Sequence, residues 1–108
     1  MLILFDHGTP LPLAPLLTGH SVKNAKEMGW DILSNGDLLV ATESAGFEIL
    51  LTTDKNIRYQ QNLAERTIAI VVLSHPQWPV IRLYADRVAA AVNAAKPGGY
   101  VVVEIPNR

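Results

Sequence analysis

The sequence predicts one α/β domain over residues 1–108, in which helices cover both faces of a mostly parallel, five-stranded sheet in three layers. Two observations lead to this fold class. Apolar runs without polar alternation recur along the chain, as expected of strands that are buried on both faces. Segments with helical spacing separate these runs, and this alternation is typical of parallel sheets with crossover helices. The expected topology is the strand order 2-1-3-4-5 of flavodoxin-like folds.

The first part of the chain predicts two strands and a short helix. Residues 2–5 are an uninterrupted apolar run, which is typical of a buried strand. Thr9 followed by a proline is a helix-start pattern, and the prolines beyond it limit this helix to a short or irregular one that ends at Gly19. Residues 20–24 predict a second short strand, and residues 25–28 predict one helical turn.

The middle of the chain predicts a helix and the third strand. Apolar residues recur at spacings of three and four over residues 35–45, and Gly46 is suited to end a helix there. Residues 49–52 form the next apolar run and predict a strand. The polar segment 56–64 predicts at most one helical turn.

The last part of the chain predicts a long helix between two strands. Residues 68–73 are apolar throughout, which indicates a central parallel strand. Residues 78–95 have a helical pattern that ends at a Lys-Pro-Gly-Gly stretch, and residues 100–104 predict the final strand. The expected buried stripe of the helix contains Ile81, Tyr84, Val88, Ala91 or Val92, and Ala95.

The composition excludes several classes of protein. The formal net charge is −1, so no global basic field favours nucleic acid, and any RNA binding needs a local basic patch. The chain has no cysteine, which excludes disulfides, thiolate zinc sites and cysteine nucleophiles. No apolar run approaches the length of a membrane span, so we expect a cytoplasmic protein without membrane partners. The low charged fraction, 18 %, leads us to expect a homodimer or higher oligomer.

Two aspartates follow strands that the predicted topology makes neighbours. Asp6 comes directly after the first strand and Asp54 after the third. The functional crevice of such a sheet lies at the carboxyl ends of these two strands, about 4.8 Å apart, so the carboxylates can converge on one small cation. Asp37 is a third candidate ligand, although an acidic residue there also stabilises the start of a helix. Asn35 is most simply the residue that caps this helix.

Residues near Asp54 extend the candidate site. The hydroxyl of Thr53 can orient a water or a phosphate, or simply end a strand. Arg58 beside Tyr59 can hold a phosphate and stack a base, as in sites for single-stranded RNA, and Lys55 adds to this rim. The simpler interpretation of these three residues is an ordinary solvated loop.

Several stretches together resemble the PIN-like domain family, whose relatives include the ribonuclease toxins of bacterial toxin–antitoxin pairs. They are LFDHGTP at 4–10, MGW at 28–30, NGDLL at 35–39 and LTTDKN at 51–56. The resemblance implies a ribonuclease that depends on Mg²⁺ or Mn²⁺ and cuts RNA phosphodiester bonds, with an antitoxin protein as partner. It implies catalytic and metal-binding roles for Asp6, Asp37 and Asp54. Asn35, Thr53 and Asn56 would surround the metal without binding it directly.

The chain also departs from the family pattern. His7, Asn35 and Asn56 stand where relatives carry acidic residues, so fewer carboxylates remain to hold a cation. The alternative is therefore a catalytically weakened or inactive PIN-like domain that acts as an RNA- or protein-binding oligomerisation module. A receiver-like signalling domain fits less well, because the chain lacks paired acids after the first strand and a lysine late in the sheet.

Overall fold

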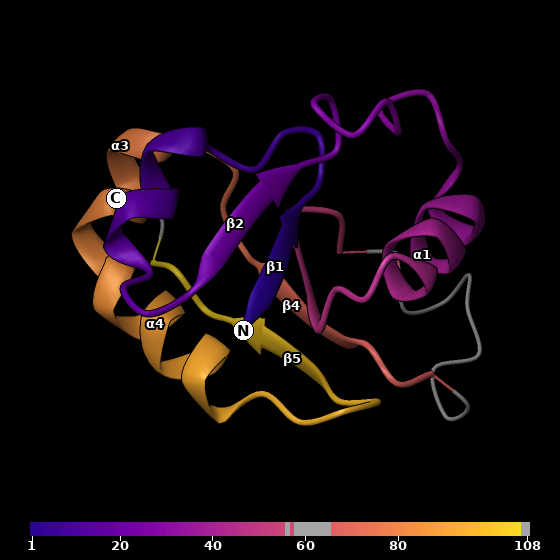
Figure 1. The fold of residues 1–108 in the computed structure, drawn as a ribbon. Helices are drawn as coiled ribbons and strands as arrows, with labels where there is room; N and C mark the ends of the chain where they lie inside the picture. The colour runs from indigo at the N-terminus through magenta and orange to yellow at the C-terminus, as the bar shows by residue number, and fades with distance from the viewer. Residues whose placement is uncertain (56, 58–65, 107–108) are drawn as a thin grey trace.

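The sheet has the predicted topology. The structure is a computed structural model, and it describes residues 1–55, 57 and 66–106. Within these residues, five strands form one all-parallel sheet in the order β2-β1-β3-β4-β5 (Figure 1). This order confirms the predicted α/β class and places β1 next to β3. The strands are β1 (Leu2–Phe5), β2 (Ser21–Asn24), β3 (Ile49–Thr52), β4 (Ala69–Leu73) and β5 (Tyr100–Val103).

The helices connect these strands. The described ones are η1 (Leu11–Leu16), α1 (Asn35–Ser44), α3 (Trp78–Ile81), η3 (Arg82–Tyr84) and α4 (Ala85–Ala94). The turn predicted over 56–64 falls on residues that, apart from Ile57, lie outside the described part of the chain. Within that part, none of the helices has both the length and the apolar character needed to cross a bilayer.

The structure corrects two of the predicted helices. The segment 25–28 forms turns, in which the side chains of Asn24 and Glu27 bond each other's backbone N–H and Gly29 reverses the chain with a φ of 78°. The single helix predicted over 78–95 is divided into α3, η3 and α4. It changes at Tyr84, whose φ of −126° and ψ of 24° depart from helical geometry.

Each face of the sheet carries its own apolar core. Phe5, Leu51 and Val71 point to one face, where they pack with side chains from η1, α3 and α4. Leu4, Leu50 and their neighbours point to the other face, toward α1. Figure 1 shows η1, α3 and α4 on one side of the sheet and α1 on the other. Burial on both faces explains why the central strands are uninterrupted apolar runs.

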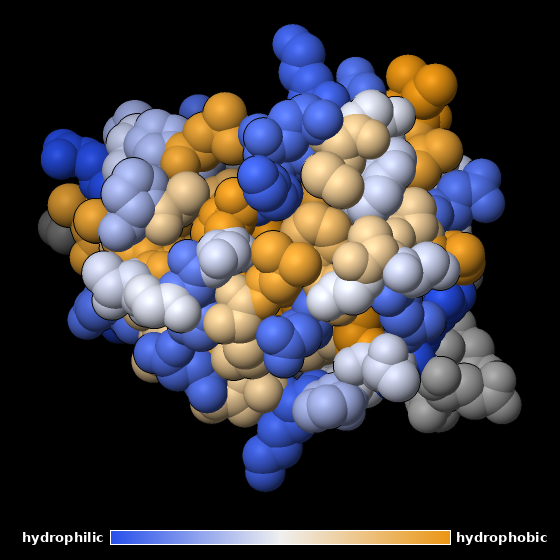
Figure 2. Space-filling view, in the orientation of Figure 1, coloured by the Kyte–Doolittle hydropathy of each residue, from blue (hydrophilic) through white to orange (hydrophobic). Residues whose placement is uncertain are grey.

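Apolar side chains that remain on the surface are spread over several elements. Figure 2 shows them interspersed with polar groups on the visible face. The exposed large hydrophobic residues among those described are Leu11, Leu16, Ile32, Val40, Leu83, Val101 and Val102. The expected homodimer or higher oligomer stays a prediction, because the structure contains a single chain.

Glu43 anchors the start of β4 to α1. Its Oε2 accepts hydrogen bonds from the Thr67 backbone N–H at 2.6 Å, the Thr67 hydroxyl at 3.0 Å and the Ile68 N–H at 3.2 Å. Its Oε1 pairs with Arg66 at 3.4 Å. The hydrogen bond from the Thr67 backbone is the main cause that holds the pKa of Glu43 below its ordinary value of 4.5. The carboxylate therefore stabilises the folded state in its charged form.

We expect Glu43→Gln to lower the free energy of unfolding at pH 7 by about 1 kcal/mol, a value reduced because the carboxylate is partly exposed. The pKa of Glu43 is lower in the folded state than in the unfolded state. Its contribution to stability is therefore complete above pH 4.5 and is lost as the pH falls through the pKa of the folded state. Urea unfolding at pH 7 and at several pH values below 4.5 measures both effects. Equal pH dependence in the variant and the wild type would contradict this assignment.

Candidate functional site

Asp6 and Thr52 meet at the carboxyl ends of β1 and β3. Phe5 is paired with Leu51 in the sheet, so the next residue of each strand lies at the same level. Alternation along the strands directs both side chains toward the face that α1 covers. There the Thr52 hydroxyl donates a hydrogen bond to Asp6 Oδ2 at 2.8 Å. Thr52 is fully buried, which fixes the position of this hydroxyl.

The same hydroxyl connects Asp6 to Asp54. Thr52 Oγ1 accepts a hydrogen bond from the Asp54 backbone N–H at 3.0 Å while it donates to Asp6. One buried side chain therefore contacts both the Asp6 carboxylate and the backbone of Asp54. The sequence analysis missed Thr52 and considered Thr53 instead. Side chains alternate along β3, so Thr52 points to the same face as Leu50. The pairing of Phe5 with Leu51 then places Thr52 next to Asp6.

Asn35 contacts the side chain of Asp54. Its Nδ2 donates a hydrogen bond to Asp54 Oδ2 at 2.7 Å. The prediction that Asn35 caps the helix is wrong, because Ser34 is the N-cap and its Oγ accepts the Asp37 backbone N–H at 3.3 Å. Asn35 is instead the first residue of α1, and its side chain turns toward Asp54 at the end of β3. The amide thus lies beside the Asp54 carboxylate.

A tight turn after β1 fixes the Asp6 carboxylate. The Thr9 backbone N–H bonds the Asp6 carbonyl at 3.0 Å, and Gly8 takes a positive φ of 96°. The His7 backbone N–H donates to Asp6 Oδ1 at 2.7 Å, and the buried Thr9 hydroxyl donates to the Leu51 carbonyl at 3.0 Å. Each carboxylate oxygen of Asp6 therefore accepts one hydrogen bond from this framework and keeps a second lone pair for a ligand.

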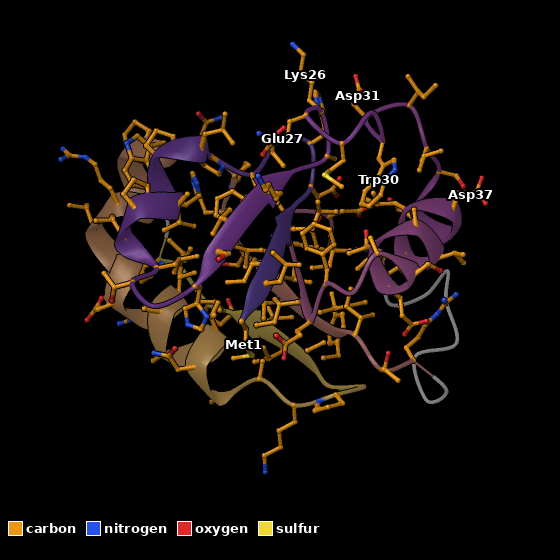
Figure 3. All side chains as sticks on the ribbon, in the orientation of Figure 1. Met1, Lys26, Glu27, Trp30, Asp31 and Asp37 are labelled. Carbon is orange, nitrogen blue, oxygen red and sulfur yellow. The ribbon has the colours of Figure 1, made fainter. Side chains whose placement is uncertain are left out.

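The other predicted site residues are arranged differently. Asp37 is exposed in the first turn of α1 and points outward (Figure 3). Among the described residues, no three acidic or histidine side chains form a group that could hold one metal ion, so Asp37 does not join Asp6 and Asp54 in such a group. Thr53 is half-buried, and Lys55 is exposed. Asn56, Arg58 and Tyr59 lie outside the described part of the chain.

A hollow opens on the other side of Asp6, between the ends of β1 and β2. Its volume is about 150 Å³. The residues that line it are Asp6, His7, Gly8, Thr9, Leu11, Asn24, Ala25 and Lys26. Asp6 therefore belongs both to this hollow and to the cluster with Thr52. A larger hollow of about 270 Å³ lies near the opposite ends of β4 and β5 and is lined mostly by apolar residues.

Comparison with known proteins provides no family for the chain. No family model, no curated protein and no solved structure matches it. The candidate function therefore rests on the residues and on their geometry.

Proposed function

We propose that the chain is a metal-dependent endoribonuclease of PIN-like type, which hydrolyses RNA phosphodiester bonds with Mg²⁺ or Mn²⁺. The observation that carries the proposal is the link that the Thr52 hydroxyl makes between the Asp6 carboxylate and the Asp54 backbone N–H. The link lies at the carboxyl ends of neighbouring parallel strands, where sheets of this class place their functional residues. An antitoxin protein as partner is part of the same proposal, by resemblance to the toxin ribonucleases.

The residues present suit a small, hard cation. Mg²⁺ is commonly held by one or two carboxylates and keeps several of its waters, so Asp6 and Asp54 are a sufficient pair. Among the described residues, Asp6 forms no ion pair, and its carboxylate accepts hydrogen bonds from the His7 backbone and the Thr52 hydroxyl. When bound, the metal supplies an activated water and neutralises charge on the phosphate. Thr52 would orient the Asp6 carboxylate, and Asn35 would orient that of Asp54.

RNA cleavage by the purified protein tests this proposal directly. We expect cleavage of a labelled single-stranded RNA in Mn²⁺ or Mg²⁺ and none in EDTA. Asp54→Asn should lose this activity, because one of the two charged ligands is removed. Cleavage that persists at the same rate in Asp54→Asn would identify a contaminating nuclease and contradict the proposal.

Restoring an acid at position 35 provides a gain-of-function prediction. Asn35→Asp places a second carboxylate against Asp54, where the amide now donates at 2.7 Å. Without metal, we expect the variant to unfold at a lower temperature, because like charges repel. With Mn²⁺, we expect the affinity to rise about tenfold, since metal affinity increases with the number of charged ligands. Isothermal titration calorimetry measures the affinity.

Asp37→Asn is the matched control for this prediction. It changes the charge by one unit in the opposite direction two residues away, at an exposed position that points away from the cluster. We expect its Mn²⁺ affinity to equal that of the wild type. An Asp37→Asn variant that loses metal binding would assign Asp37 to the metal site and would contradict the two-carboxylate arrangement.

A second candidate function is a non-catalytic PIN-like module that binds RNA or protein. The contact that favours it is the Asn35 amide on Asp54, which occupies one carboxylate oxygen with a hydrogen bond at 2.7 Å. A protein that binds RNA without cleaving it in Mn²⁺ would support this candidate over the nuclease.

A further inference from the structure

The hollow beside Asp6 has the size and the position of a binding subsite for part of a larger ligand. It lies at the carboxyl ends of β1 and β2, so it continues the edge of the sheet on which the Asp6–Asp54 pair stands. Its volume of about 150 Å³ is below the roughly 300–1,000 Å³ of sites for whole drug-sized ligands. The hollow therefore suits a fragment of a larger molecule whose remainder lies elsewhere on the surface.

The lining combines a cation, polar groups and apolar walls. Lys26 stands at the rim, and its side chain extends into solvent above the β2 end (Figure 3). His7 is exposed, and its imidazole forms no hydrogen bond or ion pair with another described residue. Leu11, which is 55 % exposed, and the buried Ala25 form the apolar part of the wall. This combination can hold a phosphate at the rim and pack a sugar against the wall.

The negative charge of Asp6 and Asp54 means that an RNA phosphate needs a positive side chain nearby in order to bind in this hollow. Asp6 contributes negative charge to the hollow itself, and Asp54 adds more beyond Thr52. A phosphate next to this pair is repelled unless a positive group lies on its other side. Lys26 is the lysine that lines the hollow, and its flexible stem lets the ammonium reach a phosphate over the mouth.

We propose that this hollow binds one nucleotide unit of a single-stranded RNA, with Lys26 on its phosphate and Leu11 against its ribose. The unit would neighbour the phosphate that lies at Asp6 and Asp54, so its position on the substrate rests on the proposed function. Binding itself does not depend on cleavage and can be measured without metal.

The first arm of the test is the affinity for a fluorescein-labelled hexauridylate RNA, measured by anisotropy in EDTA. Lys26→Gln is expected to weaken binding about fivefold and to reduce the salt slope by about one. Lys23→Gln is the matched control, because Lys23 is also exposed and lies outside the hollow. Its affinity should stay within about 1.5-fold of the wild type, apart from the general effect of net charge.

The second arm places a negative charge on the wall of the hollow. Leu11→Glu is expected to weaken binding at least about tenfold, since it repels the phosphate and removes the apolar contact. The matched control is Leu16→Glu, which adds the same charge to the same helix η1 at a residue that is 46 % exposed and outside the hollow.

Competition with uridine 5′-monophosphate, uridine and inorganic phosphate identifies the group that is recognised. We expect the monophosphate to compete best.

The outcomes separate this inference from the proposed nuclease. Weakened binding in Lys26→Gln and Leu11→Glu, with both controls unchanged, supports the hollow even if no RNA is cleaved in Mn²⁺. Wild-type affinity in Lys26→Gln overturns the inference, also when Mn²⁺-dependent cleavage is observed. The inference is equally overturned if the wild type does not bind the RNA, or if inorganic phosphate competes as well as the monophosphate.

Discussion

Asp6→Asn is expected to reduce Mn²⁺-dependent RNA cleavage at least about 100-fold, which corresponds to about 2.7 kcal/mol of transition-state stabilisation. Asp6 is the residue on which the site is built, because the turn through His7 and the Thr52 hydroxyl each fix one of its carboxylate oxygens. An amide of the same shape keeps one of these two acceptor oxygens and loses the charge that holds a divalent cation. A gel assay with labelled RNA measures the rate.

The same variant should lose the stabilisation that the metal gives to the fold. A ligand at 100 times its dissociation constant stabilises the folded state by about 2.7 kcal/mol, or about 10–20 °C in Tm for a domain of this size. We expect this shift with Mn²⁺ in the wild type and not in Asp6→Asn. Asp31→Asn is the matched control, because Asp31 is exposed and points outward (Figure 3). A normal Mn²⁺ shift in Asp6→Asn would contradict the assignment of Asp6.

Thr52→Val is expected to have the second-largest effect on the site. Valine keeps the shape of the buried side chain but removes the hydroxyl that joins Asp6 Oδ2 to the Asp54 backbone N–H. We expect the loss of both hydrogen bonds of this buried hydroxyl to cost about 1–3 kcal/mol of unfolding free energy. The Mn²⁺ affinity should fall about 10–100-fold, as it does when groups that orient metal ligands are removed.

Thr53→Val is the control for this prediction. The residue is adjacent in sequence, but it lies after the end of β3 and is only half-buried. We expect it to change stability by less than about 0.5 kcal/mol and to leave the metal affinity unchanged. Calorimetric Mn²⁺ titration with both variants decides the matter: equal affinities would show that the Thr52 hydroxyl does not organise the site.

The sheet was predictable because its strands are buried on both faces. An apolar run such as Ile49–Thr52 has the same appearance in any parallel sheet, and its boundaries in the sequence match those of β3. The division of the long helix was not predictable. It depends on the backbone of Tyr84, whose ring packs against the core while Arg87 lies 4.8 Å above it. These are tertiary contacts that local periodicity does not encode.

The part of the candidate site that lies at strand ends was predictable from the sequence. Asp6 and Asp54 follow neighbouring strands, and the Thr52 hydroxyl bonds the carboxylate of Asp6 and the backbone N–H of Asp54. The choice of Thr52 over Thr53 depends on the register between β1 and β3, which the sequence does not contain. The rotation of α1 likewise decides that Asn35 faces Asp54 while Asp37 faces solvent.

The central claim is that Asp6 and Asp54 hold one divalent cation between them, and paramagnetic broadening by Mn²⁺ in the ¹⁵N–¹H NMR spectrum tests it most directly. Substoichiometric Mn²⁺ broadens the amides nearest to the ion. The account predicts that broadening begins at residues 6–9 and 52–55 and disappears in Asp6→Asn. Broadening centred on another part of the chain, or an unchanged spectrum at millimolar Mn²⁺, would contradict it.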